Sequence, residues 1–465
     1  MLRESVLSEA ARVVGRSNVG GADGYFRPGS GSTGLTALKP GSPEEIQDLV
    51  YLAVESGLPI YTVRARYLGS SLREAEGLLL DLSRMDRIID IDSRNMKARV
   101  EAGVTYEKFQ RAAGEEGLRV LLPVSGTSRS VLRSNLDRDV LLGSSSFKRS
   151  SLSVFKAVLG NGEVWASGTQ QLGREGRPDF GEDQGPQLSG AFSASEDIFG
   201  IPYQATIYLY PRFETRKAFL FGFAEREGAL EFVRLAARRE HCFQCAAAEG
   251  TYWGALTGAD AGQSARNAAE LAAWPWSVVV SLEHDERLVS FWEEALVDEA
   301  AGCGGEPVTG SPRGLVAGAL ERPWYRWEYD SLAGDAHVVN YHCYPRSAGE
   351  LFDTVEDEIG ARDGLTLGRV VVPLSFGGSL FCETVAFVRP EEFKSLTAPT
   401  LAAYRAVFEK GALIDRPTGA VAKFMFESAD PGYRRMLALL KKQFDPHCIL
   451  NPGALPVDFT GEEAL

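Results

Sequence analysis

The segment 341–344 concentrates side chains that can act as an acid, a base or a nucleophile. It reads Tyr341-His342-Cys343-Tyr344 and follows an alternating run that predicts a β-strand. An imidazole titrates near neutral pH and can serve as a general base, and a phenol can donate a hydrogen bond. We therefore interpret Tyr341 and His342 as candidate catalytic residues. The alternative is a strand whose aromatic side chains pack in a core or an interface.

The histidines and cysteines do not form a pattern typical of a metal site. His337 and His342 are an odd number of positions apart, so they would lie on opposite faces of a strand. Cys242 and Cys245 form a lone CxxC, whereas structural zinc and iron–sulfur sites have a second pair nearby. Six cysteines in 465 residues are also too sparse for a disulfide framework. We expect reduced thiols and no metal.

Composition and charge exclude several classes of protein. The chain has 465 residues, of which 44% are hydrophobic, enough for two or three regions with their own cores. A net charge of −14 argues against a nucleic-acid partner, which would need clustered Lys and Arg. No run approaches the roughly 18 apolar residues of a membrane span, and the N-terminus has no signal-peptide core. A cytoplasmic location is the expectation.

Turn and periodicity signals predict an α+β fold at the start of the chain. Ser42 caps a helix that begins at Pro43 and ends at Gly57. A further helix spans 105–117, and Asn161-Gly162 predicts a hairpin with a type I′ turn between 153–159 and 163–165. The other predicted strands are 58–63, 77–82, 96–102 and 201–210. The polar stretch 168–190 is interpreted as a long functional loop.

The pattern changes near residue 212, where helices such as 228–239 begin to alternate with strands such as 276–282. We therefore divide the chain at that point. Residues 1–211 form the first domain, residues 212–398 the second, and residues 399–465 a helical segment that returns to the first domain. The amphipathic helix 433–442 near its end runs into a turn fixed by Pro446, Pro452 and Gly453.

That turn carries a family resemblance. Residues 444–453, Phe-Asp-Pro-His-Cys-Ile-Leu-Asn-Pro-Gly, resemble the C-terminal signature of the FAD-linked oxidases that share the fold of vanillyl-alcohol oxidase and p-cresol methylhydroxylase. Four further segments resemble that family in the family's order, namely 40–46, 80–88, 100–105 and 194–201. The resemblance covers most of the chain. It implies an FAD-binding domain followed by an α+β substrate-capping domain.

In that family the flavin pyrophosphate is held by backbone amides of two glycine-rich loops, because glycine lets the backbone approach the phosphates closely. Here the first loop, 63–71, keeps a single glycine, and the second, 125–139, carries bulky and charged side chains. The resemblance assigns cofactor contacts to Arg64, Arg66, Gly69, Ser70, Gly126, Arg133, Gly200, Ile201 and Asn451.

Two interpretations of these altered loops remain open. In the first, Arg64, Arg66, Arg129 and Arg133 replace amide contacts with guanidinium–phosphate pairs, and FAD binds in a remodelled site. In the second, the side chains fill the space and FAD is lost, with Asp137 and Asp139 adding negative charge near the phosphates.

The resemblance also suggests catalytic residues. Arg416 falls near a Tyr-Arg pair that binds phenolate substrates in this family, with Asp415 in place of the tyrosine. His342 or Tyr341 would correspond in kind to the base or to the side chain that tethers the flavin.

Two functions follow from the resemblance. One is a component of an FAD-linked oxidoreductase that acts on a small alcohol, phenol or hydroxy acid, with a remodelled or weakened flavin site. The other is a non-catalytic, flavin-free subunit that pairs with a flavin-bearing paralogue. The expected partners are accordingly a small-molecule substrate and either such a paralogous subunit, in a hetero-oligomer, or an electron-transfer protein.

Overall fold

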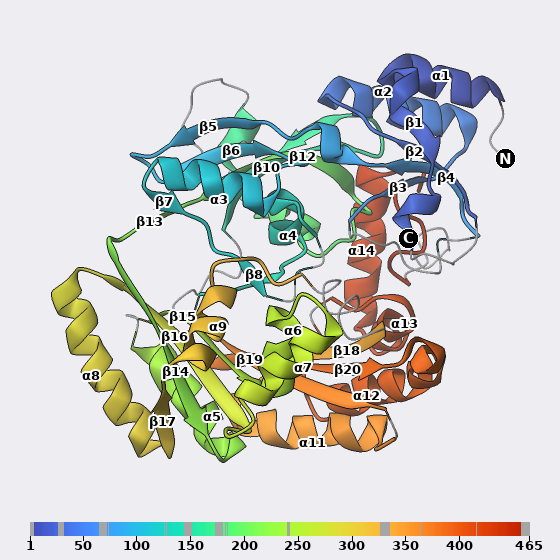
Figure 1. Cartoon of the computed structure of the whole chain (residues 1–465). Coiled ribbons are helices and arrows are strands. Elements are labelled where there is room, and N and C mark those ends of the chain that lie inside the picture. Colours follow the sequence, from blue (N-terminus) through green and yellow to red (C-terminus); the bar gives the residue numbers. More distant parts are fainter. Residues whose placement is uncertain are drawn as a thin grey trace.

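The computed structural model describes most of the chain (Figure 1). The described residues are 4–26, 32–64, 72, 74–124, 126, 128–143, 151–172, 180, 181, 183, 185–239, 242–325, 335–362, 364–414 and 416–456. They form a mixed α and β structure, as predicted. Two smaller sheets lie in the upper half of Figure 1, and a larger sheet lies below them.

The upper half contains a parallel and an antiparallel sheet. Their strands are β1 (Val19–Gly21), β2 (Gly34–Leu38), β3 (Ile60–Thr62), β4 (Glu76–Leu80), β5 (Ile88–Asp92), β6 (Lys97–Glu101), β10 (Leu152–Leu159), β11 (Val164–Ala166) and β12 (Gly200–Tyr208). The first sheet has the order β1-β2-β4-β3, in which β2, β4 and β3 run parallel. The second has the order β11-β10-β12-β6-β5. The carboxyl ends of β3 and β4 therefore lie side by side.

Helices and short strand pairs complete this half. They are α1 (Glu4–Val14), α2 (Pro43–Ser56), α3 (Tyr106–Glu115) and α4 (Val131–Leu136), with β7 (Leu118–Arg119) paired to β13 (Tyr210–Pro211) and β8 (Pro123–Val124) paired to β9 (Val140–Leu141). The predicted start of α2 is confirmed, because the Ser42 side chain accepts from the Glu45 amide and Pro43 is the first helical residue. Its predicted end is confirmed too, since Gly57 has φ 65°.

The hairpin between β10 and β11 is confirmed, but its predicted type I′ turn is wrong. A type I′ turn needs positive φ at both central residues, whereas Gly162 has φ 83° and Asn161 does not have a positive φ. The Leu159 amide donates to the Glu163 carbonyl, which leaves a three-residue loop with the glycine last. A three-residue loop typically ends in one left-handed residue, so glycine is needed only at that position.

The lower half is one seven-stranded sheet with the order β17-β14-β16-β15-β19-β20-β18. The strands are β14 (Thr215–Phe223), β15 (Cys242–Glu249), β16 (Trp276–His284), β17 (Gly305–Val308), β18 (Asp335–Cys343), β19 (Thr366–Leu374) and β20 (Ser379–Val388). The helices are α5 (Arg226–Arg238), α6 (Gly250–Thr257), α7 (Ala261–Glu270), α8 (Glu286–Gly302), α9 (Ser311–Ala319), α11 (Ala348–Ile359), α12 (Thr397–Glu409), α13 (Gly419–Glu427) and α14 (Pro431–Phe444).

The two faces of this sheet pack against different partners. On one face, residues of α5, α8, α11 and α12 form a hydrophobic cluster that includes Tyr341 of β18. On the other face, α6 and α9 pack together with Val124 of β8 and Val140 of β9. This second face therefore lies toward the upper half of the molecule, where the two halves meet.

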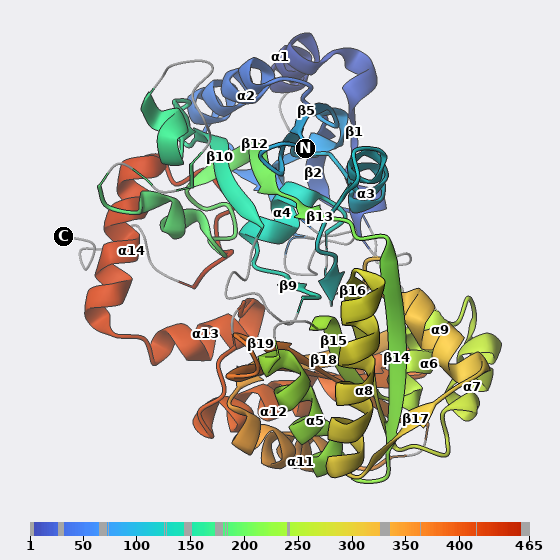
Figure 2. The same cartoon turned by 90° about the vertical axis from the view of Figure 1, so that its left-hand side faces the viewer.

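The C-terminal segment divides its packing between the halves. Ala403 and Val407 of α12 belong to the cluster of the large sheet, whereas Phe444 of α14 and Leu450 belong to the core of the upper half. Figures 1 and 2 show α14 running from the lower half to the upper half. The domain boundaries at residues 211/212 and 398/399 stay a proposal, with α12 packed on the second domain.

The structure also bears on cysteines, metals and membranes. All six cysteines are free thiols. Within the described ranges, no group of three or more His, Cys, Asp or Glu side chains could hold a metal ion. Every helix in the described part of the chain is too short or too polar to cross a membrane.

A buried ion pair fixes the turn after α14. Lys441 and Asp445 are 2% and 0% exposed. The Lys441 Nζ donates to Asp445 Oδ2 at 2.6 Å and to the carbonyls of Ile198 and Leu450. The Asp445 carboxylate also accepts from the amides of Ile449 and Leu450. One lysine and one carboxylate thus satisfy both backbone polar groups of Leu450 and the amide of Ile449 in the signature turn.

Replacing Asp445 with Asn should lower the free energy of unfolding by about 3 kcal/mol, because the ammonium of Lys441 would stay buried without its counter-charge. Urea unfolding of the two proteins measures this difference. Asp430→Asn is the matched control. Asp430 is an exposed residue that caps the other end of α14 by accepting a hydrogen bond from the Tyr433 amide. Removing its charge should lower the free energy of unfolding by only about 1 kcal/mol or less. Equal losses in the two variants would contradict this role for the buried pair.

Candidate functional site

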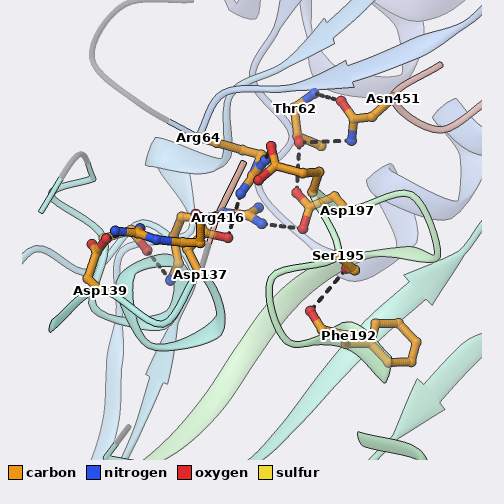
Figure 3. A network of polar contacts seen from close by, with 12 residues as sticks. Thr62, Arg64, Asp137, Asp139, Phe192, Ser195, Asp197, Arg416 and Asn451 are labelled. Carbon is orange, nitrogen blue, oxygen red and sulfur yellow. Dashed lines mark hydrogen bonds and ion pairs between the residues drawn. The ribbon is translucent and has the colours of Figure 1, made fainter. Parts of the chain in front are cut away.

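A polar network lies at the carboxyl end of β3, where five separate segments of the chain meet (Figure 3). The side chain of Asn451 accepts from the Thr62 amide at 3.0 Å and donates to the Thr62 hydroxyl at 3.2 Å. That hydroxyl donates to Asp197 Oδ2 at 2.7 Å. The C-terminal signature turn is thereby joined to β3 and to the loop before β12.

Ion pairs extend this network across the site. Arg64 pairs with Asp137, at 2.6 Å, and with Glu196. Arg133 pairs with Asp197, and both side chains are 5% exposed. Arg416 pairs with Asp139, whose side chain is fully buried. Each of these three arginines thus has a carboxylate partner within the protein.

Helix α4 supplies the centre of the network. Ser130 caps α4 by accepting from the Arg133 amide, and every residue of the helix is buried. Arg133 lies on this helix, and Asp137 and Asp139 follow its end. A buried six-residue helix tolerates charged side chains only where they are paired, which the arginine–carboxylate contacts achieve.

The loop that supplies Glu196 and Asp197 has a strained backbone. Ala194, Glu196 and Asp197 have φ of 54°, 56° and 57° without being glycines. This left-handed conformation costs about 1–2 kcal/mol for each L-residue. The contacts of Glu196 with Arg64, and of Asp197 with Arg133 and Thr62, stabilise the loop in this conformation.

The first cavity, of about 400 Å³, opens at the carboxyl ends of β3 and β4. Arg64 and Arg133 lie on its wall beside Arg129, which is exposed. Other polar groups on the wall are the carboxylate of Asp81 and the hydroxyls of Ser83, Thr105, Ser128 and Ser130. In open sheets with parallel strands, this end of the sheet is where ligands bind.

The second cavity, of about 240 Å³, lies beside the C-terminal helices α13 and α14. Its polar wall contains Arg138, Glu196 and Arg416. Its apolar wall includes Phe199 with Met425, Phe426 and Leu437. The cavity therefore combines an apolar body with guanidinium groups at its edge.

The predicted cofactor residues are only partly brought together. Arg64 and Arg133 line the first cavity, whereas Asn451 does not line it and is bonded to Thr62. Gly200 and Ile201 instead pair with β10 inside the antiparallel sheet and lie on the wall of neither cavity. Arg66, Gly69 and Ser70 lie outside the described residues, as does Asp415.

Gly126 has a contact that differs from the one predicted. Its amide, predicted to approach phosphate, donates to the Trp324 carbonyl at 3.1 Å. A Cβ at this position would lie 3.3 Å from Asp139 Oδ2, so a carboxylate oxygen lies beside this glycine. That oxygen is buried without a hydrogen-bond partner among the described residues.

The three predicted catalytic residues lie in different surroundings. Arg416 lies on the wall of the second cavity, three residues after Leu413, which exchanges backbone hydrogen bonds with His342. The His342 ring contacts Phe381 on the sheet face that lies toward the upper half. Tyr341 points to the opposite face and is completely buried in the helix-covered core, where burial raises the pKa of its hydroxyl. Of the three, only Arg416 lines one of the two cavities; His342 lies on the sheet face toward the upper half, and Tyr341 lies on the opposite face.

Sequence reasoning missed Thr62 and Glu196 as site residues. Thr62 appears in the sequence as an ordinary strand residue, and no local pattern indicates its contact with Asn451, 389 positions away. Glu196 and Asp197 lie inside the segment 194–201 that carried the family resemblance, so this motif was the one available signal.

Comparisons with known proteins agree with this geometry. Residues 35–168 match the family model described as an FAD binding domain. An uncharacterised FAD-linked oxidoreductase of Mycobacterium tuberculosis is 26% identical over 439 residues, which cover 90% of each chain. A 1′-carboxy-chondrochloren decarboxylase of Chondromyces crocatus is 30% identical over 191 residues, or 40% of this chain and 35% of that protein.

A solved structure shows the fold. The crystal structure of p-cresol methylhydroxylase with substrate bound superposes with a TM-score of 0.79 at 18% identity, and the match covers 98% of this chain and 97% of that chain. This confirms the expected fold, with FAD as the cofactor that the matched domain implies.

The first cavity fits the adenosine end of FAD. Adenosine presents hydroxyl and amino donors, for which Asp81 and the serine hydroxyls provide acceptors, and its phosphates need donors such as Arg129. Arg64 and Arg133, for which contacts with the pyrophosphate were predicted, have carboxylate partners, whereas a glycine-rich cradle would offer backbone amides.

The buried Asp139 should make stability depend on pH. Burial raises the pKa of its carboxyl, against the opposing effect of Arg416. A raised folded-state pKa means that the protonated form favours folding, so this contribution is complete below the unfolded pKa of about 3.9 and is lost as pH rises through the folded pKa. Relative to an Asp139→Asn variant, the wild type should therefore lose stability as pH rises from about 4 toward neutrality.

Urea unfolding of both proteins at several pH values measures that slope. The slope of the difference reports the net pKa shift of Asp139, because the ion pair with Arg416 forms only when Asp139 is ionised and its effect is therefore already part of that pKa. A difference that grows in favour of the wild type with rising pH would contradict the raised pKa.

Proposed function

We propose that the chain belongs to the FAD-linked oxidases with the p-cresol methylhydroxylase fold and that it acts in the oxidation of a small alcohol, phenol or hydroxy acid, with a remodelled flavin site. The observation that carries the proposal is the first cavity at the carboxyl ends of β3 and β4. All the residues that line it lie within the matched FAD binding domain, and they include polar partners for both the nucleoside and the phosphates.

The chain's own residues would bind and orient the reactants. Ser128 and Ser130 provide hydroxyls at the first cavity, and Arg129 provides a cation there. Bound FAD supplies the acceptor for the two electrons of the oxidation. At the edge of the second cavity, whose apolar wall would face the flavin ring, the guanidinium of Arg416 pairs with Asp139 and can bind an oxygen anion of the substrate in exchange for that carboxylate.

His342 is the candidate base of this proposal. Its backbone is bonded to the segment that leads to Arg416, and its ring lies on the sheet face toward the upper half. A histidine there could accept the proton that leaves a substrate hydroxyl. Tyr341 takes no part in the chemistry, because its side chain lies on the opposite face of the sheet.

A second function is favoured by a different observation. Arg64 and Arg133, which would have to replace the missing glycine amides, are paired with Asp137, Glu196 and Asp197. Phosphates would have to compete with these carboxylates. The alternative is therefore a non-catalytic subunit that pairs with a flavin-bearing paralogue in a hetero-oligomer. Docking of an electron-transfer protein and a cytoplasmic location also remain proposals.

Flavin content separates the two functions. The absorbance spectrum of the purified chain, with flavin quantified against protein, should show near-equimolar FAD, and acid precipitation should show whether FAD is covalently attached. Ser83→Trp, which puts an indole into the first cavity from an exposed 3₁₀ helix, should lower the flavin content severalfold.

Ser17→Trp is the matched control, because Ser17 is also an exposed serine of a 3₁₀ helix but does not line the cavity, and it should leave the flavin content unchanged. A colourless wild-type chain that takes up no added FAD would overturn the oxidoreductase and favour the flavin-free subunit. Equal flavin content in the two variants would show that FAD does not bind in the first cavity.

A further inference from the structure

One ion pair joins the walls of the two cavities. Arg64 lines the first cavity and Glu196 lines the second, and their side chains are in contact. The guanidinium of Arg64 also pairs with Asp137, at 2.6 Å, so two carboxylates hold it between the cavities. Figure 3 shows Arg64 within the network that connects Thr62, Asp137 and Asp197. The contact of Arg64 with Glu196 therefore lies at the boundary between the two spaces.

The two cavities differ in the way that the two ends of a flavin dinucleotide differ. The first is rich in hydroxyls and cations, as a nucleoside and its phosphates require. The second is largely apolar, with Phe199, Met425 and Phe426 on its wall, as a planar ring system requires. The pyrophosphate of a ligand that used both would pass the Arg64–Glu196 contact.

We propose that the Arg64–Glu196 ion pair closes the passage between the two cavities, and that a dinucleotide occupies both only when its pyrophosphate replaces Glu196 as the partner of Arg64. This inference rests on the proposed function, since FAD is the dinucleotide in question. It assigns a role to Glu196: its carboxylate occupies Arg64 when no ligand is bound and thereby weakens FAD binding.

Electrostatics gives the direction of this competition. A pyrophosphate brings negative charge to a guanidinium that already has Asp137 and Glu196 as partners, so like charges repel at the point of entry. Arginine binds phosphate oxygens in the same bidentate manner as carboxylates, so the exchange keeps its hydrogen bonds. The ligand must therefore displace one carboxylate, and Glu196 lies on the side of the second cavity.

The backbone of the loop supports Glu196 as the carboxylate that moves. Ala194, Glu196 and Asp197 have positive φ, a conformation that persists only where side-chain contacts maintain it. Asp137, by contrast, follows a buried helix, and its own φ is −75°. Release of Glu196 would relieve strain in its loop, whereas release of Asp137 would not.

The test is the affinity for FAD of a Glu196→Gln variant, measured by quenching of flavin fluorescence. The amide keeps the shape of the side chain and removes the charge, so FAD should bind about tenfold tighter than to the wild type. A second readout is thermal unfolding: without ligand the variant should unfold at a lower temperature than the wild type, and saturating FAD should raise its unfolding temperature by more.

The matched control is Glu249→Gln. Glu249 pairs with Arg369, and these side chains are 18% and 12% exposed, compared with 14% and 16% for Glu196 and Arg64. Glu249 lines neither cavity, so this variant should lose stability without any gain in FAD affinity. A second variant, Glu196→Ala, should also bind FAD more tightly than the wild type. Agreement between the two variants would exclude a folding defect specific to one substitution.

The outcomes separate this inference from the proposed function. Tighter FAD binding by both Glu196 variants, together with unchanged binding by Glu249→Gln, supports the closing role of Glu196. Equal or weaker FAD binding by the Glu196 variants overturns that role and leaves the oxidoreductase intact. If neither the wild type nor any variant binds FAD, both the role of Glu196 and the oxidoreductase are overturned.

Discussion

The pairing of Asp197 with Arg133 and Thr62 joins the parts of this molecule that sequence order keeps far apart. Asp197 lies on the loop before β12, Arg133 on α4 and Thr62 at the end of β3, where Asn451 of the C-terminal turn is also bonded. All four side chains are buried. A buried charge is stable only when paired, so these segments must come together for any one of them to fold as it does.

This constraint also determines what the site can bind. Buried arginines whose charge is compensated by neighbouring carboxylates do not attract anions as strongly as exposed ones do. In these pairs three carboxylates face two guanidinium groups, so the region between the cavities has no excess of positive charge, whereas the wall of the first cavity also has the exposed Arg129. Recognition of phosphate then depends on an exchange of partners more than on attraction by free cations.

Local chemistry explains why some elements could be predicted and others could not. The helix from Pro43 to Ser56 is specified by its cap, its proline and its terminal glycine, all within 16 residues. The strand β5 was not predicted, because charged residues interrupt its apolar ones and it lies at the edge of its sheet. The turn at Asn161-Gly162 was placed correctly but given the wrong type, since two turn types share a final left-handed glycine and only the strand register distinguishes them.

For the site, the family motifs in the sequence predicted cofactor contacts for Arg64, Arg133 and Asn451 and a catalytic role for Arg416, and these roles stay predictions. In the structure Arg64 and Arg133 line the first cavity, Arg416 lines the second, and Asn451 is bonded to Thr62. The sequence by itself determined that β18 is a strand, because alternation is a local property. Only the tertiary structure decided that Arg64 and Arg133 pair with carboxylates, and that the face of β18 carrying Tyr341 is the one covered by helices while the face carrying His342 lies toward the upper half. Each outcome depends on what another segment places opposite the side chain, and contacts across 64 to 73 positions leave no trace in local spacing.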